Sequence, residues 1–318
     1  MFGDSFKNGP QKIYFLLVPG FSLFGLTSML APLRHANRTS NDMLYEWYLL
    51  SEFGGMICSS DEIEIKCNSS INEVDKCEML VICSGTHPQA ELTPGLLAFI
   101  RRQSHYGAEI GCQDTGAFIV ASAGVLDGYR ATTHWENYAS TVDSFPNVNF
   151  AQELLVIDRK RFSCPGALSG LDMMLHLVSE QHGSELATSV ADELVYTQQR
   201  AHTEPQRRSL QIRLDSRNAN LIEAIQLMEK NIEEPLLISD LVEYIGISDR
   251  ELERLFKRHL QQTPKAFYRQ LRLEKARWML QQTLDSVTAI SMACGFASLS
   301  HFTRSYQQLF SKKPSQER

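Results

Sequence analysis

The chain has 318 residues and a mass of 36.0 kDa, and at about 100–200 residues per domain this length predicts two domains. Hydrophobic residues make up 43% and charged residues 21%, an ordinary globular composition that argues against disorder over most of the chain. The formal net charge is −6, but residues 1–205 carry −11 whereas residues 206–318 carry +5. An acidic first part and a basic second part indicate that only the second part meets a polyanion.

Targeting segments and cysteine motifs are missing from the sequence. No stretch reaches the ~18 apolar residues of a membrane span, and the N-terminal residues lack the apolar core of a signal peptide. The seven cysteines include no CxxC pair, so their spacing suits neither a disulfide framework nor a zinc site. We therefore expect a cytoplasmic protein with reduced cysteines, no membrane contact, no metal and no cofactor.

Residues 11–200 alternate between short apolar runs and helical segments. Apolar runs without polar alternation are typical of parallel strands that are covered on both faces. Their alternation with helices predicts an α/β domain with a parallel sheet flanked by helices. Strands are expected at 12–18, 45–51, 79–83 and 108–111, and helices at 26–37, 96–103 and 116–123.

The pattern changes near residue 200. Residues 201–217 begin with a polar stretch that contains Pro205, and we expect a linker with few contacts there. Residues 218–318 show helical periodicity instead. Apolar residues recur at three- and four-residue steps, as one buried helix face requires; these are Leu221, Ile225, Met228 and Ile232.

Within residues 218–318 one pattern occurs twice, about 50 residues apart. A short helix reaches a glycine, Gly246 or Gly295, which supplies the left-handed turn between two helices that cross steeply. A serine then begins a second helix; Ser248 followed by Glu251 is a capping box. The pattern is that of a helix-turn-helix motif, present in two copies. The short helices are expected at 239–244 and 287–293, the second helices at 248–260 and 298–310, and a long helix beginning at Pro264 between the copies, with Phe267, Leu271, Ala276 and Leu280 buried.

The second helix of each copy has a polar face that can reach phosphates or base edges. If Leu252, Leu255 and Phe256 face the core, the opposite face is basic, and an Arg there can form a bidentate pair with guanine. The alternative is two solvated amphipathic faces, but two copies in register within the basic part of an acidic chain favour DNA. The candidate DNA-binding residues are Arg250, Arg254, Lys257, Ser300, His301, Thr303 and Arg304.

Residues 218–318 resemble the DNA-binding domain of the AraC/XylS family of transcriptional regulators. The resemblance implies that the second helices enter successive major grooves of operator DNA, and that two subunits bind direct repeats as a homodimer. It also implies activation of transcription, with RNA polymerase as a possible partner. Two residues depart from the family pattern: Ser311 replaces a usual glycine, and Glu317 a usual aromatic residue. The resemblance depends on residues 252–256, Thr263-Pro264, 271–276, Ala289-Ile290, 293–296, Ser298, Ser300, Phe302, Arg304 and Pro314.

Residues 108–136 combine a strand, a sharp turn and a helix, the geometry of a nucleophile elbow. This segment resembles the class-I glutamine amidotransferase-like (PfpI-like) fold, as fused to AraC-type domains. Enzymes of that fold carry a cysteine at the elbow, whereas the aligned residue is Asp114, and Cys112 lies two residues earlier. Phe24 stands where an acidic residue is usual. A ligand-binding domain derived from an enzyme is therefore expected.

An elbow without catalysis leaves a pocket suited to a small zwitterion. Backbone N–H groups after Asp114 suit a carboxylate, and Trp135, with Tyr129 or Trp47 if they lie near, suits an amine. The alternative for each aromatic residue is core packing. Proteins that the chain resembles look like sensors of arginine, carnitine or glycine betaine. The candidate ligand-binding residues are Asp114, Thr115, His134 and Trp135.

Two other functions remain to be weighed against a ligand-responsive regulator. The first is a PfpI-like amidase or protease with an accessory helical domain, which Asp114 in place of cysteine disfavours. The second is a purely structural DNA-binding protein, which leaves an acidic α/β domain of about 200 residues unexplained.

Overall fold

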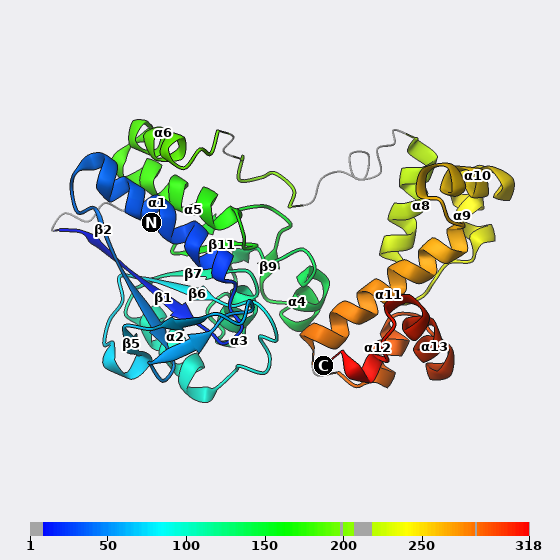
Figure 1. Cartoon of the computed structure of the whole chain (residues 1–318), viewed down its shortest axis with the longest axis horizontal. Coiled ribbons are helices and arrows are strands. Elements are labelled where there is room, and N and C mark those ends of the chain that lie inside the picture. The colour runs from blue at the N-terminus through cyan, green and yellow to red at the C-terminus, as the bar shows by residue number, and fades with distance from the viewer. Residues whose placement is uncertain (1–8, 198–199, 207–217, 284, 318) are drawn as a thin grey trace. The chain divides into compact units, whose positions relative to one another are not determined.

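The computed structural model describes residues 9–197, 200–206, 218–283 and 285–317. The chain divides into two compact units, Met1–Gln206 and Arg207–Arg318, and each is described by itself (Figure 1). Among the described residues, no helix has both the length and the apolar character that crossing a membrane requires.

The N-terminal unit is built on a mostly parallel sheet, as the sequence predicted. Among the described residues the sheet has seven strands in the order β10-β11-β7-β6-β1-β2-β5. Neighbouring strands are parallel except for β10 and β11, which are antiparallel at one edge. The strands are β1 (Gln11–Leu17), β2 (Tyr45–Ser51), β5 (Ser69–Ser70), β6 (Met79–Cys83), β7 (Glu109–Gln113), β10 (Val156–Asp158) and β11 (Arg161–Cys164).

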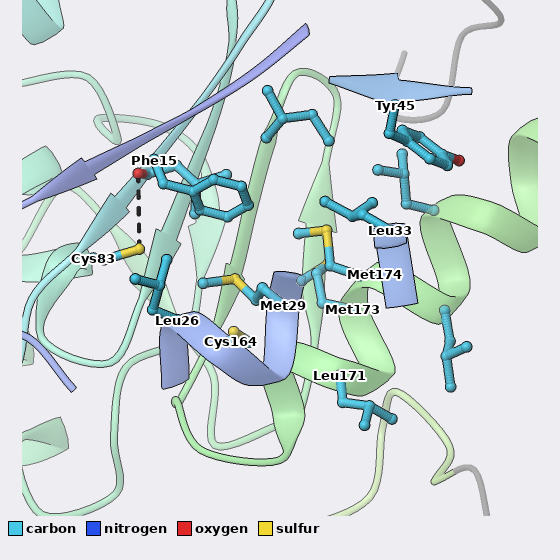
Figure 2. Packing of buried hydrophobic residues seen from close by; sticks show 14 of the residues in the cluster. Phe15, Leu26, Met29, Leu33, Tyr45, Cys83, Cys164, Leu171, Met173 and Met174 are labelled. Atoms are coloured by element: carbon cyan, nitrogen blue, oxygen red, sulfur yellow. Dashed lines mark hydrogen bonds between the residues drawn. The ribbon is translucent and has the colours of Figure 1, made fainter. Parts of the chain in front are cut away.

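Helices cover both faces of this sheet because its strands bury side chains on both faces. In β1, Ile13, Phe15 and Leu17 belong to one buried cluster and Leu16 to the other. Figure 2 shows the first cluster, in which Leu26 and Met29 of α1 pack near the α5 methionines. Helices α1 (Leu23–Ser40), α5 (Ser169–His182) and α6 (Ser184–Glu193) lie on that face, and α2 (Pro94–His105) and α3 (Gly116–Ser122) on the other.

The sequence did not predict the helices α5 and α6, of 14 and 10 residues, or the strands β5, β10 and β11, and most of the remaining elements that it missed are short. A strand of two or three residues gives almost no periodicity, so only tertiary pairing defines it. The antiparallel hairpin of β3 and β4 and the parallel pair of β8 and β9 belong to this group. These elements are β3 (Met56–Cys58), β4 (Glu64–Lys66), η1 (Ile71–Glu73), β8 (Arg130–Ala131), α4 (Tyr138–Ser144) and β9 (Asn149–Phe150).

The second unit contains the two predicted helix-turn-helix motifs. Gly246 and Gly295 adopt φ of 76° and 71°, the left-handed conformation expected for these turns. The side chains of Ser248 and Ser298 cap the second helices, as predicted. The helices are α8 (Ala219–Lys230), α9 (Ile238–Ile245), α10 (Asp249–Leu260), α11 (Pro264–Gln282), α12 (Val287–Ala293) and α13 (Leu299–Phe310), followed by η2 (Pro314–Gln316).

The long helix α11 contributes to two separate cores, and this corrects the predicted buried face. Ala276 and Leu280 are buried as predicted, but Phe267 and Leu271 are only partly buried. Tyr268 and Leu273 are buried in their place. Tyr268 packs in the first motif and Leu273 in the second, so the buried face changes along the helix.

The predicted linker is partly integrated into the N-terminal unit. We expected few contacts for residues 201–217, but residues 201–206 form backbone hydrogen bonds with residues 154 and 155 and a bridge to Glu153. Polar composition misled the prediction because the segment satisfies its backbone groups by pairing with an irregular segment of the unit. Residues 207–217 lie outside the described residues.

Candidate functional sites

The predicted elbow lies at the carboxyl ends of the central strands. Asp114 follows β7 directly and precedes α3, and its φ of 58° places a non-glycine residue in the left-handed region. Its N–H donates to the carbonyl oxygen of Cys164 at the end of β11, at 3.0 Å. A Cβ atom at Gly166 would lie 3.1 Å from Asp114 Oδ2, so glycine lets this loop approach the carboxylate. Loops at this edge are where parallel α/β sheets bind ligands.

Two carboxylates and an imidazole interact at the elbow. Burial, followed by the charge of Glu136, raises the pKa of Asp114 to about 7, against a hydrogen bond from the Thr115 N–H. Burial lowers the pKa of His134, and Glu136 opposes that shift. His134 Nδ1 lies 3.7 Å from Glu136 Oε2. Glu136 was not among the predicted site residues, although it directly follows the predicted pair His134-Trp135 in the sequence.

Thr115 takes part in the elbow through its backbone. Its Oγ1 donates to the Gly85 carbonyl oxygen at 2.7 Å and lies 3.1 Å from Ser84 Oγ. The residue is 1% exposed. The hydroxyl therefore fixes the elbow to the loop after β6, while the N–H faces the Asp114 carboxylate.

Three aromatic residues were candidates for binding an amine, and of these only Trp135 lies in the loop of residues 132–135 beside the elbow. Its ring is 5.4 Å from that of His134 and it is partly exposed. One face of the Tyr129 ring is covered by the Arg159 guanidinium, 3.6 Å from the ring centre. Trp47 lies in β2 and packs against the cluster on the α1 face.

The residues that could support thiol chemistry face elsewhere. Cys112 is buried, its Sγ lies 3.7 Å from the Phe162 carbonyl oxygen, and burial raises its pKa. Phe24 is 53% exposed, so the residue of α1 that faces the elbow strand is Gly25. A Cβ atom at Gly25 would lie 1.9 Å from Nε2 of the fully buried Gln113. Gln113 therefore occupies the space between α1 and the elbow strand.

A surface cavity of about 230 Å³ lies away from these residues. It is at the opposite, amino-terminal end of β1 and contains none of the predicted site residues. Its lining is Gly9, Gln11, Asp42, Met43, Leu44, Gln181 and His182.

The predicted DNA-binding face of α10 is exposed. Arg250, Arg254 and Lys257 are solvent-accessible, while the apolar residues Leu252, Leu255 and Phe256 are buried as predicted. The capping box is only half formed. The Ser248 hydroxyl accepts from the Glu251 N–H, but the Glu251 carboxylate binds Arg254 instead of returning to Ser248.

The corresponding face of α13 is also accessible. Ser300, His301 and Arg304 are exposed and Thr303 is partly exposed, opposite the buried Phe302. The His301 ring contacts that of Phe296, with 5.8 Å between their centres, so this histidine also supports the turn.

The long helix holds the second turn in place. Arg272 Nε donates to the carbonyl oxygen of Cys294 at 2.7 Å, and the guanidinium lies 4.1 Å from the centre of the Phe296 ring. Glu317, which departs from the family pattern, lies 3.4 Å from Arg277 and accepts from Gln281 at 3.1 Å. Polar contacts thus replace the aromatic packing that the pattern usually provides.

Comparison with known proteins places these features in one family. Residues 241–318 match the family described as a helix-turn-helix domain. The chain is 40% identical over 308 residues to the HTH-type transcriptional regulator CdhR of Pseudomonas aeruginosa, covering 97% of this chain and 91% of that protein. It is 37% identical over 312 residues to the HTH-type transcriptional regulator GbdR of Pseudomonas aeruginosa, covering 98% and 85%.

Solved structures resemble part of the chain. An AraC family transcriptional regulator from Pseudomonas putida is similar at a TM-score of 0.54 and 27% identity, over 58% of this chain and 100% of that one. A THiJ/PfpI family protein from Pseudomonas syringae shares the fold at a TM-score of 0.54 and 21% identity, over 68% of this chain and 85% of that one. The chain therefore belongs to the AraC family of DNA-binding HTH-type transcriptional regulators and combines their DNA-binding domain with an N-terminal domain of the PfpI-like fold.

Proposed function

We propose that this regulator activates transcription in response to a small nitrogenous carboxylate, an amino acid or a methylated amine, bound at the elbow. Asp114, Thr115, His134 and Trp135 form the binding site. The observation that carries the proposal is the grouping of His134, Trp135 and Glu136 beside the elbow. The His134 ring lies 5.4 Å from the Trp135 ring and its Nδ1 lies 3.7 Å from Glu136 Oε2, and the preceding Thr133 donates to the Asp114 carbonyl oxygen. Two carboxylates next to an aromatic face suit an organic cation.

This charge arrangement favours one orientation of the ligand. The sequence suggested the ligand carboxylate toward the helix start and the amine toward the aromatic residues. However, α3 has only seven residues and its start adjoins the carboxyl group of Asp114, whose pKa is already raised by burial and by the charge of Glu136, so a further carboxylate there is disfavoured. We therefore orient the cationic group toward Asp114, Glu136 and Trp135, with the ligand carboxylate pointing away.

The N-terminal domain acts without catalysis in this proposal. Asp114 replaces the nucleophilic cysteine, and Cys112 points its thiol into the core. Gly25, with no side chain, faces the elbow strand. A thiolate nucleophile, and an acidic residue at the usual position on α1, are thus missing from the described elbow.

The second unit delivers the response to operator DNA. Arg250, Arg254 and Lys257 of α10 and Ser300, His301, Thr303 and Arg304 of α13 face the DNA. We further propose a homodimer formed through the N-terminal unit, so that two subunits present four reading helices, and contact with RNA polymerase during activation. Light scattering at micromolar concentration, with and without DNA, tests the dimer; a monomer under both conditions contradicts it.

A thermal-shift series on the full-length protein tests the effector site. Glycine betaine, L-carnitine and L-arginine are the probes, because a ligand that binds the folded state raises the melting temperature with dose. We expect Trp135→Ala to lose the response and keep its DNA affinity without ligand. Trp135→Phe, which retains an aromatic face, should preserve most of the thermal-shift response. Arg304→Ala should bind the probe like wild type and lose affinity for DNA. If Trp135→Ala responds like wild type, Trp135 is a packing residue and the effector site lies elsewhere.

A further inference from the structure

The segment that leaves the N-terminal unit, residues 200–206, is bound to that unit at both ends; we refer to it as the coupling segment. Its first anchor is Arg200, whose Nε and Nη2 lie 3.0 and 2.6 Å from Asp172 Oδ2. Asp172 is 1% exposed and also accepts from the Tyr196 hydroxyl at 2.8 Å. The ion pair is a strong attachment because Arg200 cannot leave without stranding the charge of the buried carboxylate.

The second anchor is the side chain of Gln206, the last residue of the unit. Its Nε2 lies 2.9 Å from Thr132 Oγ1, 2.9 Å from the Thr133 carbonyl oxygen and 3.1 Å from the Glu153 carbonyl oxygen. Between the anchors, the N–H groups of Leu154 and Leu155 donate to the carbonyl oxygens of Glu204 and His202 at 3.1 and 3.2 Å. The coupling segment therefore pairs along residues 153–155.

Both anchors are attached to parts of the elbow site. Thr133 donates its hydroxyl to the Asp114 carbonyl oxygen at 3.2 Å and directly precedes His134 and Trp135. Asp172 lies in the first turn of α5, which follows the loop of Gly166 against the Asp114 side chain. A change in the loop of residues 132–135 thus acts directly on the acceptors of Gln206.

The Gln206 anchor is finely balanced. Two amide protons are shared among three acceptors, so they cannot all form full-strength hydrogen bonds. Its Oε1 is buried without a hydrogen-bond partner among the described residues. The desolvation of that oxygen offsets part of what the amide protons gain. The strength of the anchor therefore depends on the positions of its acceptors in the loop of residues 132–133 and at Glu153.

We propose that the coupling segment transmits effector binding to the DNA-binding unit, with occupancy of the elbow and anchoring of Gln206 favouring each other. The inference rests on the proposed function, because it needs an effector at His134 and Trp135. A ligand that fixes their loop also fixes Thr132 and Thr133 as acceptors. Release of Gln206 adds residues 201–206 to the covalent connection that leads to Asn218, the cap of α8, while Arg200 stays attached to Asp172. A longer connection changes the effective concentration of one unit at the other.

The coupling is reciprocal, and this supplies the test. If effector binding strengthens the anchor, loss of the anchor weakens effector binding by the same factor. The test compares Gln206→Ala with Gln181→Ala in the full-length protein. Gln181 is a matched control, because it lies in the same unit, bonds through its amide to Gln11 and Tyr45, and is remote from the elbow loop.

Three quantities are measured for each variant. The first is hydrogen exchange at the Leu154 and Leu155 amides, which reports whether the segment is anchored. The second is the affinity for a duplex selected by the wild-type protein from a random pool, without any small molecule. The third is the ratio of DNA affinities with and without the probe, either glycine betaine or L-arginine. We expect Gln206→Ala to speed the exchange at least tenfold, to change DNA affinity at least threefold and to bring the ratio close to one.

The outcomes separate this inference from the proposed function. If Gln206→Ala speeds exchange but leaves both DNA affinity and the ratio as in Gln181→Ala, the coupling role is wrong while the effector site stands. Unchanged exchange in Gln206→Ala also overturns it, because Gln206 is then no anchor. If neither probe binds wild type but Gln206→Ala changes DNA affinity, the coupling segment stands and the proposed effector class fails.

Discussion

Arg254 lays its guanidinium across the carboxylate of Glu251, with Nε 2.8 Å from Oε2 and Nη2 2.7 Å from Oε1. The pair occupies the exposed face of α10 that is directed toward DNA in the proposed function. Exposed ion pairs of this kind contribute little to stability. Glu251 therefore orients Arg254 in the free protein, and in the proposed function the pair opens when a guanine or a phosphate takes its place.

The first prediction concerns the two reading helices. Arg254→Ala and Arg304→Ala should each weaken binding of the selected duplex roughly ten- to hundredfold and relax specificity at different positions. The reason is that each variant removes one of the bidentate base contacts that the proposed function assigns to these arginines. Titration against duplexes with single base changes measures this. Arg159→Ala, an arginine of the N-terminal unit, is the control, and wild-type binding by both test variants would show that the groove assignment is wrong.

The second prediction concerns stability and pH at the elbow. Asp114 has a folded-state pKa of about 7, whereas an unfolded aspartate ionises near 4. Between about pH 4 and pH 7 the Asp114 carboxyl keeps its proton in the folded state but loses it in the unfolded state. The free energy of unfolding therefore decreases as pH rises to about 7. Asp114→Asn should therefore stabilise the N-terminal unit at pH 8 and have little effect near pH 4. An increase of at least about 2–4 °C at pH 8 is expected, the shift that 1 kcal/mol produces in a domain of this size.

Melting curves of both proteins across this pH range provide the measurement. The affinity of wild type for a cationic probe should instead increase as pH rises, because Asp114 becomes negatively charged only as pH passes about 7. Equal melting temperatures of wild type and Asp114→Asn at pH 8 would mean that the carboxylate is not destabilised by burial.

The third prediction is that the N-terminal domain does not hydrolyse amides or esters. Asp114 lacks an activating neighbour of the usual kind, and the Cys112 thiol is buried with a raised pKa. Assays with a panel of chromogenic amides and esters should give the background rate. Turnover that disappears in Asp114→Asn would overturn the regulator-only role, and turnover that disappears only in Cys112→Ser would move the reactive residue two positions upstream.

The fourth prediction concerns the end of α13. Ser311 adopts a φ of 59° where the family pattern has glycine. A left-handed conformation costs a non-glycine residue about 1 kcal/mol or more. Ser311→Gly should therefore raise the free energy of unfolding of the DNA-binding unit by about 1 kcal/mol. Denaturation is followed through the transition that operator DNA stabilises; Ser311→Ala, which keeps the Cβ atom, should not show the gain.

Parts of the fold were accessible to the sequence because they depend on local order. The runs 45–51 and 79–83 coincide with β2 and β6, since a buried parallel strand is a continuous apolar run. The helix 287–293 coincides with α12, and both turn glycines have the expected φ. In contrast, the coupling segment was predicted as a linker, because a segment that pairs only with an irregular part of the chain has no periodicity of its own.

The sequence by itself determined the two-domain organisation, the helix-turn-helix motifs and the identity of the elbow residue, because these depend on periodicity, turn chemistry and motif spacing. Tertiary structure decided what each candidate touches. In the folded chain the charge of Glu136 acts on Asp114, and the Arg159 guanidinium lies over the Tyr129 ring. The Cys112 thiol is buried in the core, and the Gln206 side chain donates to the Thr133 carbonyl oxygen. These relationships join residues from different segments, and pKa values and buried hydrogen bonds arise only when folding removes such groups from water and sets them against one another.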